Sequence, residues 1–309
     1  MSDSPIMSDA GAEKRCGFIA LIGAPNAGKS TLLNAMVGSK VSIVSPKVQT
    51  TRSRVLGIAI EGESQLIFVD TPGIFQPRRR LDRAMVAAAW AGAHDADLVA
   101  LLVDAARRGV DEDAEAIVTQ LKEAGRSAIL ALNKVDAIER PKLLALAERL
   151  NATGVFTDIF MISALTGDGL DRLRSTLAGR VPEGPWLYPE DQISDIPMRL
   201  LAAEVTREKL FLQLQQELPY ASTVETESWE EFKDGSVKIS QIVYVQRDSQ
   251  KAIVLGKGGA RVKAIGAAAR QELEAMLERR VHVMLFVKVR ENWLDDPERY
   301  RDWGLDFNA

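Results

Sequence analysis

Short apolar runs alternate with amphipathic stretches over residues 15–181. The runs "CGFIALIG", "RVLGIAI", "QLIFVD", "LVALLVD", "SAILALN" and "DIFMIS" are each bounded by glycine or polar residues, which is typical of buried strands. Helical patterns lie between these runs, in "KSTLLNAMVG" and over 82–93, 111–124, 141–150 and 168–179. The pattern therefore predicts alternating strands and helices.

One pair of strands departs from this alternation. Only the polar turn "EGES" separates "RVLGIAI" from "QLIFVD", so these two runs are expected to form a hairpin. One antiparallel pair among otherwise alternating elements predicts an α/β fold with a doubly wound, mostly parallel sheet. Ligands of such sheets bind beyond the carboxyl ends of the strands.

The pattern changes after residue 181. Several prolines interrupt residues 182–197, which indicates a linker. Beyond it, the order helix, strand, strand, helix, loop, helix, strand predicts a smaller α+β domain, if "YASTVETESW" is its first strand and "VHVMLFVKV" its last. The predicted segments are a disordered extension over 1–14, a larger domain over 15–181, the linker over 182–197, the smaller domain over 198–290 and a C-terminal tail over 291–309.

Composition is that of an ordinary globular protein. Of the 309 residues, 46% are apolar and 27% are charged, and the net charge is −4. The single cysteine, Cys16, rules out an intrachain disulfide and favours a reducing compartment. The polar first residues lack the apolar core of a signal peptide, and no stretch reaches the roughly 18 apolar residues that a membrane span needs. We therefore expect a cytoplasmic protein, with peripheral membrane contact left open.

The first glycine-rich loop, "GAPNAGKS", lies between a predicted strand and a predicted helix and matches the P-loop pattern. Its glycines let backbone amides turn inward around phosphate oxygens, and the helix presents its positive end to the anion. Lys29 adds a cation near the β- and γ-phosphates, and Ser30 offers a hydroxyl to Mg²⁺. The predicted phosphate-binding residues are Gly23, Ala24, Pro25, Asn26, Ala27, Gly28, Lys29, Ser30 and Thr31.

Two further motifs follow strands. The first contributes to the phosphate and metal site, and the second selects the base. In "DTPG", Asp70 is placed to hold Mg²⁺ and the Gly73 N–H can meet a γ-phosphate, with Thr71 and Pro72 between them. In "NKVD", the Asp136 carboxylate can accept hydrogen bonds from guanine N1–H and its 2-amino group. Adenine has neither donor, so ATP would leave this carboxylate unpaired.

The remaining base contacts come from the same strand ends. Lys134 can lie along the base plane, and Asn133 can tie the loops together. The motif "SAL" follows the last strand, where Ser163 precedes Ala164 and the Ala164 N–H is expected to meet guanine O6. Together, the motifs predict a site for GTP and GDP with Mg²⁺ as the metal.

With these motifs in order at strand ends, the chain resembles the TRAFAC class of GTPases. The segment "SIVSPKVQTTRSRV" occupies the place of the first switch. The resemblance favours Thr51 as the threonine that binds Mg²⁺ when a γ-phosphate is present, with Thr50 as the alternative. The metal ligands are then expected to be Ser30, Thr51 and Asp70.

The resemblance also bears on hydrolysis. Ile74 follows "DTPG" where Ras-like enzymes carry the glutamine that orients the attacking water, which predicts slow intrinsic hydrolysis. Lys29, Asn26 and Gly73 are the candidate catalytic residues. Related GTPases with asparagine at the position of Asn26 use K⁺, which gives the hypothesis of a potassium ion here, whereas a turn-stabilising side chain is the alternative.

The second glycine loop, "GKGG", lacks the spacing and the hydroxyl of a P-loop. It lies between two predicted helices, as the GxxG loop of a type II KH domain does, and such loops clamp about four nucleotides of single-stranded nucleic acid. Residues 248–290 hold nine basic and four acidic residues, a local charge of +5 in a chain of −4. A solvated helix face is the alternative interpretation. The candidate RNA-binding residues are Gly256, Lys257, Gly258, Gly259, Arg261 and Lys263.

A GTPase domain followed by a type II KH domain resembles the Era family of bacterial ribosome-assembly GTPases. The resemblance rests on "GAPNAGKSTLLN", "QTTR", "DTPGI", "NKVD", "SAL", the GxxG loop and the ending "VHVMLFVKVRENWLDDPERYRDWG". It implies binding near the 3′ end of 16S ribosomal RNA, a role in assembly of the 30S subunit, and loose contact with the inner membrane. We expect a monomer with no DNA partner. An RNA-binding GTP sensor with negligible turnover is the alternative function.

Overall fold

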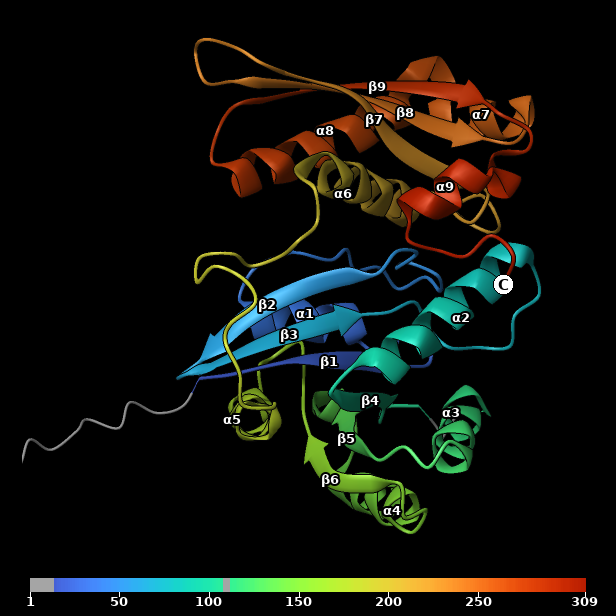
Figure 1. Ribbon diagram of the computed structural model, residues 1–309. Coiled ribbons are helices and arrows are strands. Elements are labelled where there is room, and N and C mark those ends of the chain that lie inside the picture. Colours follow the sequence, from blue (N-terminus) through green and yellow to red (C-terminus); the bar gives the residue numbers. More distant parts are fainter. Residues whose placement is uncertain (1–13, 108–111) are drawn as a thin grey trace, which may run out of the picture.

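The computed structural model describes residues 14–107 and 112–309 and consists of two domains. Figure 1 shows the larger domain, drawn in blue to yellow-green, below the smaller one, drawn in yellow to red. Apart from Lys14, the extension predicted as disordered lies outside the described residues. No helix within the described ranges is long and apolar enough to cross a bilayer.

The larger domain is built on one sheet of strands in the order β2-β3-β1-β4-β5-β6. All neighbouring strands pair in parallel except β2 and β3, which form the expected hairpin. The mostly parallel, doubly wound sheet is therefore confirmed. The strands are β1 (Arg15–Gly23), β2 (Val55–Glu61), β3 (Ser64–Asp70), β4 (Leu98–Asp104), β5 (Ala128–Asn133) and β6 (Phe156–Met161).

Helices cover both faces of this sheet, which is why its central strands are apolar on both sides. On one face, Leu33 of the first helix and Leu173 of the fifth meet in one core, and on the other face Ile117 and Leu146 meet in a second core. The first face carries α1 (Lys29–Val37) and α5 (Leu170–Arg180), and the second carries α2 (Arg80–Asp95), α3 (Glu112–Glu123) and α4 (Arg140–Asn151), with the short turn η1 (Val135–Ala137) after β5.

The proline-rich segment after α5 runs along the edge of the sheet. Ser194 forms an isolated bridge with Gly57 of β2, and its hydroxyl donates to the Leu56 carbonyl at 2.6 Å. Trp186 and Tyr188 pack on the outer side of β2 and β3. The segment therefore covers the edge strand, whose unpaired backbone would otherwise invite association.

The smaller domain has the element order expected from the sequence. Its sheet has the order β7-β8-β9, in which β7 and β8 are antiparallel and β8 and β9 are parallel. Apolar side chains of α6 and α8, including Phe211 and Ile265, form a core with Val243 and Val287. The elements are α6 (Met198–Gln213), β7 (Ser222–Glu231), β8 (Val237–Val245), α7 (Asp248–Leu255), η2 (Lys257–Gly259), α8 (Ala260–Leu277) and β9 (Val281–Val289).

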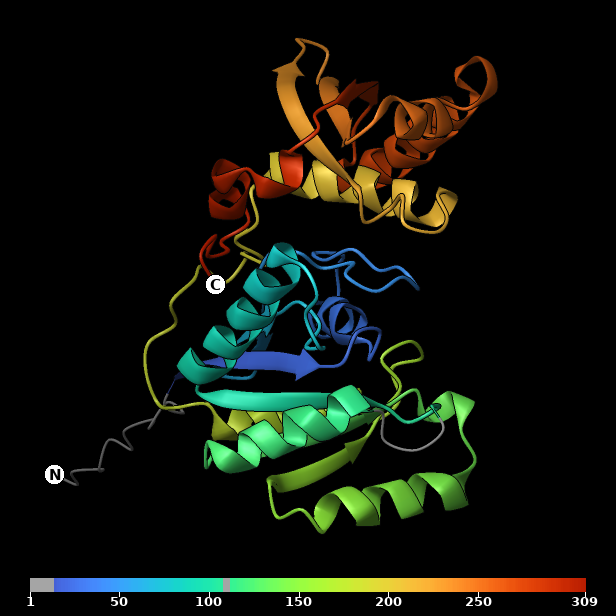
Figure 2. The same cartoon turned by 90° about the vertical axis from the view of Figure 1, so that its right-hand side faces the viewer.

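The last residues return to the larger domain. After β9 the chain forms η3 (Trp293–Asp295) and α9 (Pro297–Asp302), and Tyr300 and Leu305 pack against Leu81 and Met85 of α2. Figures 1 and 2 both show the C-terminus beside α2. The segment expected only as a tail therefore joins the two domains.

Candidate nucleotide site and candidate RNA interface

The P-loop surrounds the ammonium group of Lys29. Gly28 has a φ of 100° and precedes α1, and a side chain there would overlap Asn133 Nδ2. Lys29 is 6% exposed, and its Nζ donates to the carbonyls of Gly23 and Ala24 at 3.0 Å each. Burial lowers the pKa of Lys29 to about 8, although the charge of Asp70 acts in the opposite direction. A phosphate in the loop would supply the anion that this buried ammonium favours.

Oxygen atoms gather at the start of α1. Ser30 Oγ donates to Asp70 Oδ2 at 2.6 Å, and Thr51 Oγ1 lies 2.9 Å from Ser30 Oγ. The second oxygen of Asp70 is buried and has no hydrogen-bond partner among the described residues. Burial raises the pKa of Asp70, partly offset by the hydrogen bond from Ser30. Hydroxyl and carboxylate oxygens with an unused buried lone pair fit the hard ion Mg²⁺.

The alternative threonine points elsewhere. Thr50 Oγ1 donates to the Lys47 carbonyl at 2.7 Å and pairs with the Ser45 hydroxyl. It therefore stabilises the turn of the switch loop, whereas Thr51 faces the predicted metal ligands. This geometry favours Thr51 over Thr50.

Sequence reasoning missed Ser42, the third side chain that bonds to Asp70 after Ser30 and Thr51. Ser42 Oγ donates to Asp70 Oδ2 at 2.9 Å. Asn34 of α1 fixes this part of the loop, because its Oδ1 accepts from the backbone N–H groups of Val41 and Ser42, both at 2.9 Å. The surrounding sequence has no periodicity, so no pattern signals the contact.

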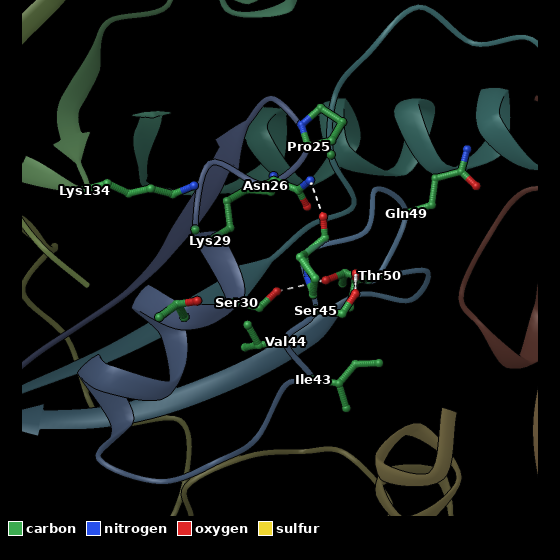
Figure 3. A pocket seen from close by; sticks show the side chains of 15 residues that line it. Pro25, Asn26, Lys29, Ser30, Ile43, Val44, Ser45, Gln49, Thr50 and Lys134 are labelled. Carbon is green, nitrogen blue, oxygen red and sulfur yellow. Dashed lines mark hydrogen bonds between the residues drawn. The ribbon is translucent and has the colours of Figure 1, made fainter. Parts of the chain in front are cut away.

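Sequence reasoning also missed the outer wall of the phosphate pocket. In Figure 3 the P-loop and the switch loop face each other across this pocket, which holds about 250 Å³. Asn26 joins the two sides, since its Nδ2 donates to the Pro46 carbonyl at 3.0 Å. The pocket lining does not include four of the predicted phosphate-binding and metal-binding residues, which are Gly23, Ala24, Ala27 and Asp70. The unpredicted lining residues are Ile43, Val44, Ser45, Pro46 and Gln49.

The predicted base-binding motifs meet beside the P-loop. Asn133 Nδ2 donates to the Ala27 carbonyl at 2.8 Å, so Asn133 ties the two loops together. Asn133 Oδ1 accepts from the Ala164 N–H at 2.9 Å, the group expected to meet guanine O6. The role of Ala164 toward guanine stays a prediction and requires this hydrogen bond to be shared or exchanged. Ser163 is buried behind it, and Asp136 is exposed.

The second switch packs against the P-loop. A side chain on Gly73 would come within 3.0 Å of Pro25, so glycine permits this approach. The Thr71 hydroxyl donates to the Leu21 carbonyl of β1 at 2.8 Å, so its role is structural. Ile74 is 6% exposed and belongs to the core beneath α2 and α3. Its side chain therefore neither reaches the phosphate pocket nor offers a polar atom to water.

The second glycine loop is open to solvent. Gly256, Gly258 and Gly259 all have left-handed φ values, of 71°, 59° and 78°. Apart from the adjacent backbone of the turn, no described atom lies within 4 Å of where a side chain on Gly258 or Gly259 would begin, so the backbone is accessible. Lys257 is exposed on this turn. The loop thus presents backbone and positive charge together, as a strand of nucleic acid requires.

Other candidate RNA residues flank this loop. Lys263 is exposed on α8, whereas Arg261 Nη1 donates to the Ile253 carbonyl at 2.6 Å and braces the turn. Ile253 is 49% exposed, but Val254 and Ile265 lie in the core. Of these three apolar residues, only Ile253 is therefore available to a ligand.

Carboxylates neutralise much of the basic surface farther from the loop. Four of the nine basic residues form ion pairs, which lie on α8, at the sheet and just after β9. These pairs are Arg270–Glu274, Arg279–Glu231, Lys288–Glu227 and Arg290–Asp296.

Comparison with protein families gives two matches. Residues 18–134 match a family described as 50S ribosome-binding GTPase, and residues 217–294 match the KH domain family. With the P-loop geometry, these matches define the class of the molecule. It is a P-loop GTPase that carries a KH domain.

Matches over the whole chain identify the family. The chain is 63% identical to GTPase Era of Afipia carboxidovorans over 293 residues, 95% of each protein, and 63% identical to GTPase Era of Rhizobium meliloti, over 99% and 98%. The chain belongs to the Era family of GTPases.

Two solved structures share this architecture. They are a point variant of Aquifex aeolicus Era bound to GDP·AlF4⁻, with a TM-score of 0.88, and Era in complex with MgGDPNP and nucleotides 1506–1542 of 16S ribosomal RNA, with a TM-score of 0.89. Each is 40% identical, and each match covers 94% of this chain and 99% of the other.

Proposed function

We propose that this GTPase is a switch that binds 16S ribosomal RNA near its 3′ end through the KH domain and acts in assembly of the 30S subunit. The observation that carries the proposal is the full-length likeness to Era in complex with MgGDPNP and nucleotides 1506–1542 of 16S ribosomal RNA. The family model that matches the larger domain is described as 50S ribosome-binding GTPase. The solved Era structure that shares both domains contains 16S ribosomal RNA, which favours the small subunit.

In this proposal, the P-loop and Lys29 hold the phosphates of GTP. Ser30, Thr51 and Asp70 hold Mg²⁺, which neutralises phosphate charge when it is bound. Asp136 accepts from guanine, and Lys134 lies along the base. The buried ammonium and the convergent oxygens support these roles.

Hydrolysis transfers the γ-phosphoryl group to water and releases GDP and phosphate. The side chain of Ile74 is buried and apolar and therefore cannot orient this water, whereas the Gly73 N–H is proposed to donate to the γ-phosphate. We propose that Lys29 stabilises charge on the phosphates and that Asn26 helps to hold K⁺ beside them. In related enzymes, a side chain that orients the water contributes strongly to the rate of hydrolysis. Ile74 cannot do so, and the intrinsic rate is therefore expected to be low.

The KH domain is proposed to clamp an RNA strand between α7 and α8. The Gly258 and Gly259 backbone is open, and Lys257 and Lys263 add charge to it. The protein is proposed to act as a monomer in the cytoplasm, with peripheral contact at the inner membrane and no DNA partner.

Multiple-turnover phosphate release, with and without 30S subunits, tests this function. The proposal predicts slow release that depends on Lys29 and that changes when subunits are present. The buried Ile74 side chain favours the competing function, an RNA-binding GTP sensor. Absence of turnover under both conditions, with GTP and RNA binding intact, would establish the sensor instead.

A further inference from the structure

The residue after Thr51 belongs to the larger domain, but its side chain lies in the smaller one. Arg52 is 2% exposed. Its Nη1 donates to the Ser222 carbonyl at 3.0 Å, and its Nη2 lies 3.4 Å from the carbonyls of Pro219 and Tyr220. Pro219 and Tyr220 belong to the connection between α6 and β7, and Ser222 is the first residue of β7. The guanidinium is therefore bonded to the backbone of the KH domain.

Aromatic rings complete the pocket around Arg52. The guanidinium carbon lies 5.7 Å from the ring centre of Phe211, 5.6 Å from that of Trp293 and 6.0 Å from that of Trp303. Phe211 belongs to α6, and the two tryptophans belong to the C-terminal segment. Carbonyls and aromatic faces are both favourable partners for a buried guanidinium.

Other contacts hold the same switch loop from α6. Arg207 donates to the carbonyl of Thr50, and Lys47 donates to the carbonyls of Phe211 and Leu214. At the start of the loop, Glu208 accepts from the Val44 N–H at 2.8 Å and from Lys40. The KH domain therefore contacts the switch loop both before and after Thr51 along the chain.

We propose that Arg52 is a positioning residue through which the KH domain holds Thr51 at the metal site. Consecutive Cα atoms are about 3.8 Å apart, so a fixed Arg52 restricts where Thr51 can lie. In this same arrangement Thr51 Oγ1 reaches Ser30 and Asp70. The KH domain then favours the Mg²⁺–triphosphate state over the diphosphate state. This inference rests on the proposed GTP site.

The contact between Arg52 and the smaller domain is suited to reversible release. Arg207 also lies over Phe211, 5.0 Å from its ring centre, so two guanidinium groups share one buried site. Arg52 Nε and Arg207 Nη1 are buried without hydrogen-bond partners among the described residues. Arg207 also forms an ion pair with Glu204, but the desolvation of both guanidinium groups still offsets part of the favourable contacts. Because coupling is reciprocal, a ligand that stabilises this domain arrangement also strengthens triphosphate binding.

The test compares nucleotide affinities of full-length variants. Arg52→Met keeps an apolar side chain of similar length among the rings but loses the bonds to the carbonyls. We expect it to weaken binding of Mg²⁺·GDPNP about tenfold and to leave Mg²⁺·GDP within about twofold, because only the triphosphate state uses Thr51. Arg174→Met is the matched control, since Arg174 donates to the Met36 carbonyl at 2.8 Å within the larger domain.

Measuring Arg52→Met in a Thr51→Ala background decides whether Arg52 acts through Thr51. If Arg52 acts through Thr51, adding Arg52→Met to Thr51→Ala should cause no further loss of GDPNP affinity. Additive losses, or equal weakening of GDP and GDPNP, would overturn the inference. If wild type binds both nucleotides and Arg52→Met leaves their ratio unchanged, only the role of Arg52 fails. If wild type binds neither nucleotide, the proposed function itself fails.

Discussion

The ammonium of Lys134 lies 2.7 Å from Asp104 Oδ2, at the adjacent ends of β5 and β4. Asp104 is itself fixed, because its Oδ1 accepts from the Ala106 N–H at 3.0 Å. The lysine of the "NKVD" motif is thus oriented by a carboxylate that lies outside the motif. Asp104→Asn should weaken GDP and GTP binding to a similar extent, by about tenfold, because the base lies far from the reacting phosphate.

A double-mutant cycle checks this orientation. In a Lys134→Ala background, Asp104→Asn should have little further effect on nucleotide affinity. Glu139→Gln is the control, since Glu139 pairs with Lys142 on the nearby surface at 2.9 Å. If Asp104→Asn still causes the full loss of nucleotide affinity in the Lys134→Ala background, Asp104 does not act through Lys134.

Asp136→Asn should change which base the site prefers. An amide cannot accept from both guanine N1–H and the 2-amino group, but it can donate to the 2-oxygen of xanthine. Competition between GTP and XTP for the variant measures the change. Undiminished preference for GTP would contradict the assignment of Asp136 to the base.

The two phosphate sites should be separable by mutation. Lys257→Asp with Gly258→Asp places negative charge on the exposed GxxG turn and should abolish RNA binding, while GTP affinity stays within about twofold. Lys238→Asp is a control on the sheet, where Lys238 already pairs with Glu230 at 3.3 Å. Retained RNA affinity in the double variant would show that the strand binds elsewhere.

Monovalent cations test the proposed role of Asn26. Hydrolysis should be faster in K⁺ than in Na⁺ at equal ionic strength, and Asn26→Ala should remove most of this difference. The competing explanation is that Asn26 only stabilises the P-loop, through its bond to the Pro46 carbonyl. Equal wild-type rates in the two salts would support that explanation.

The sequence predicted those parts of the molecule that local pattern determines. Strand ends, the P-loop and the GxxG turn are read from apolar runs and glycine positions, and the observed sheets and element order agree with them. The contacts of Ser42 with Asp70 and of Arg52 with Ser222 could not be predicted. Both arise in a loop without periodicity, whose partners are brought close only by the tertiary fold.

The C-terminal segment illustrates the same limit. It follows the last strand of the smaller domain, so its position in the chain indicated only a tail. In the structure, Trp293 and Tyr300 are buried, and the segment packs against both Arg52 and α2. Burial of these rings depends on the two domains lying together, which periodicity within one segment cannot reveal.

In the proposed switch, the nucleotide state of the larger domain controls how tightly the smaller domain holds RNA. The affinity of the full-length protein for an RNA with the sequence of nucleotides 1506–1542 of 16S ribosomal RNA tests it most directly, measured with Mg²⁺·GDPNP and with Mg²⁺·GDP. Binding should be at least about tenfold tighter with GDPNP than with GDP, within the range of typical coupling energies. Equal affinities in the two nucleotide states would contradict it.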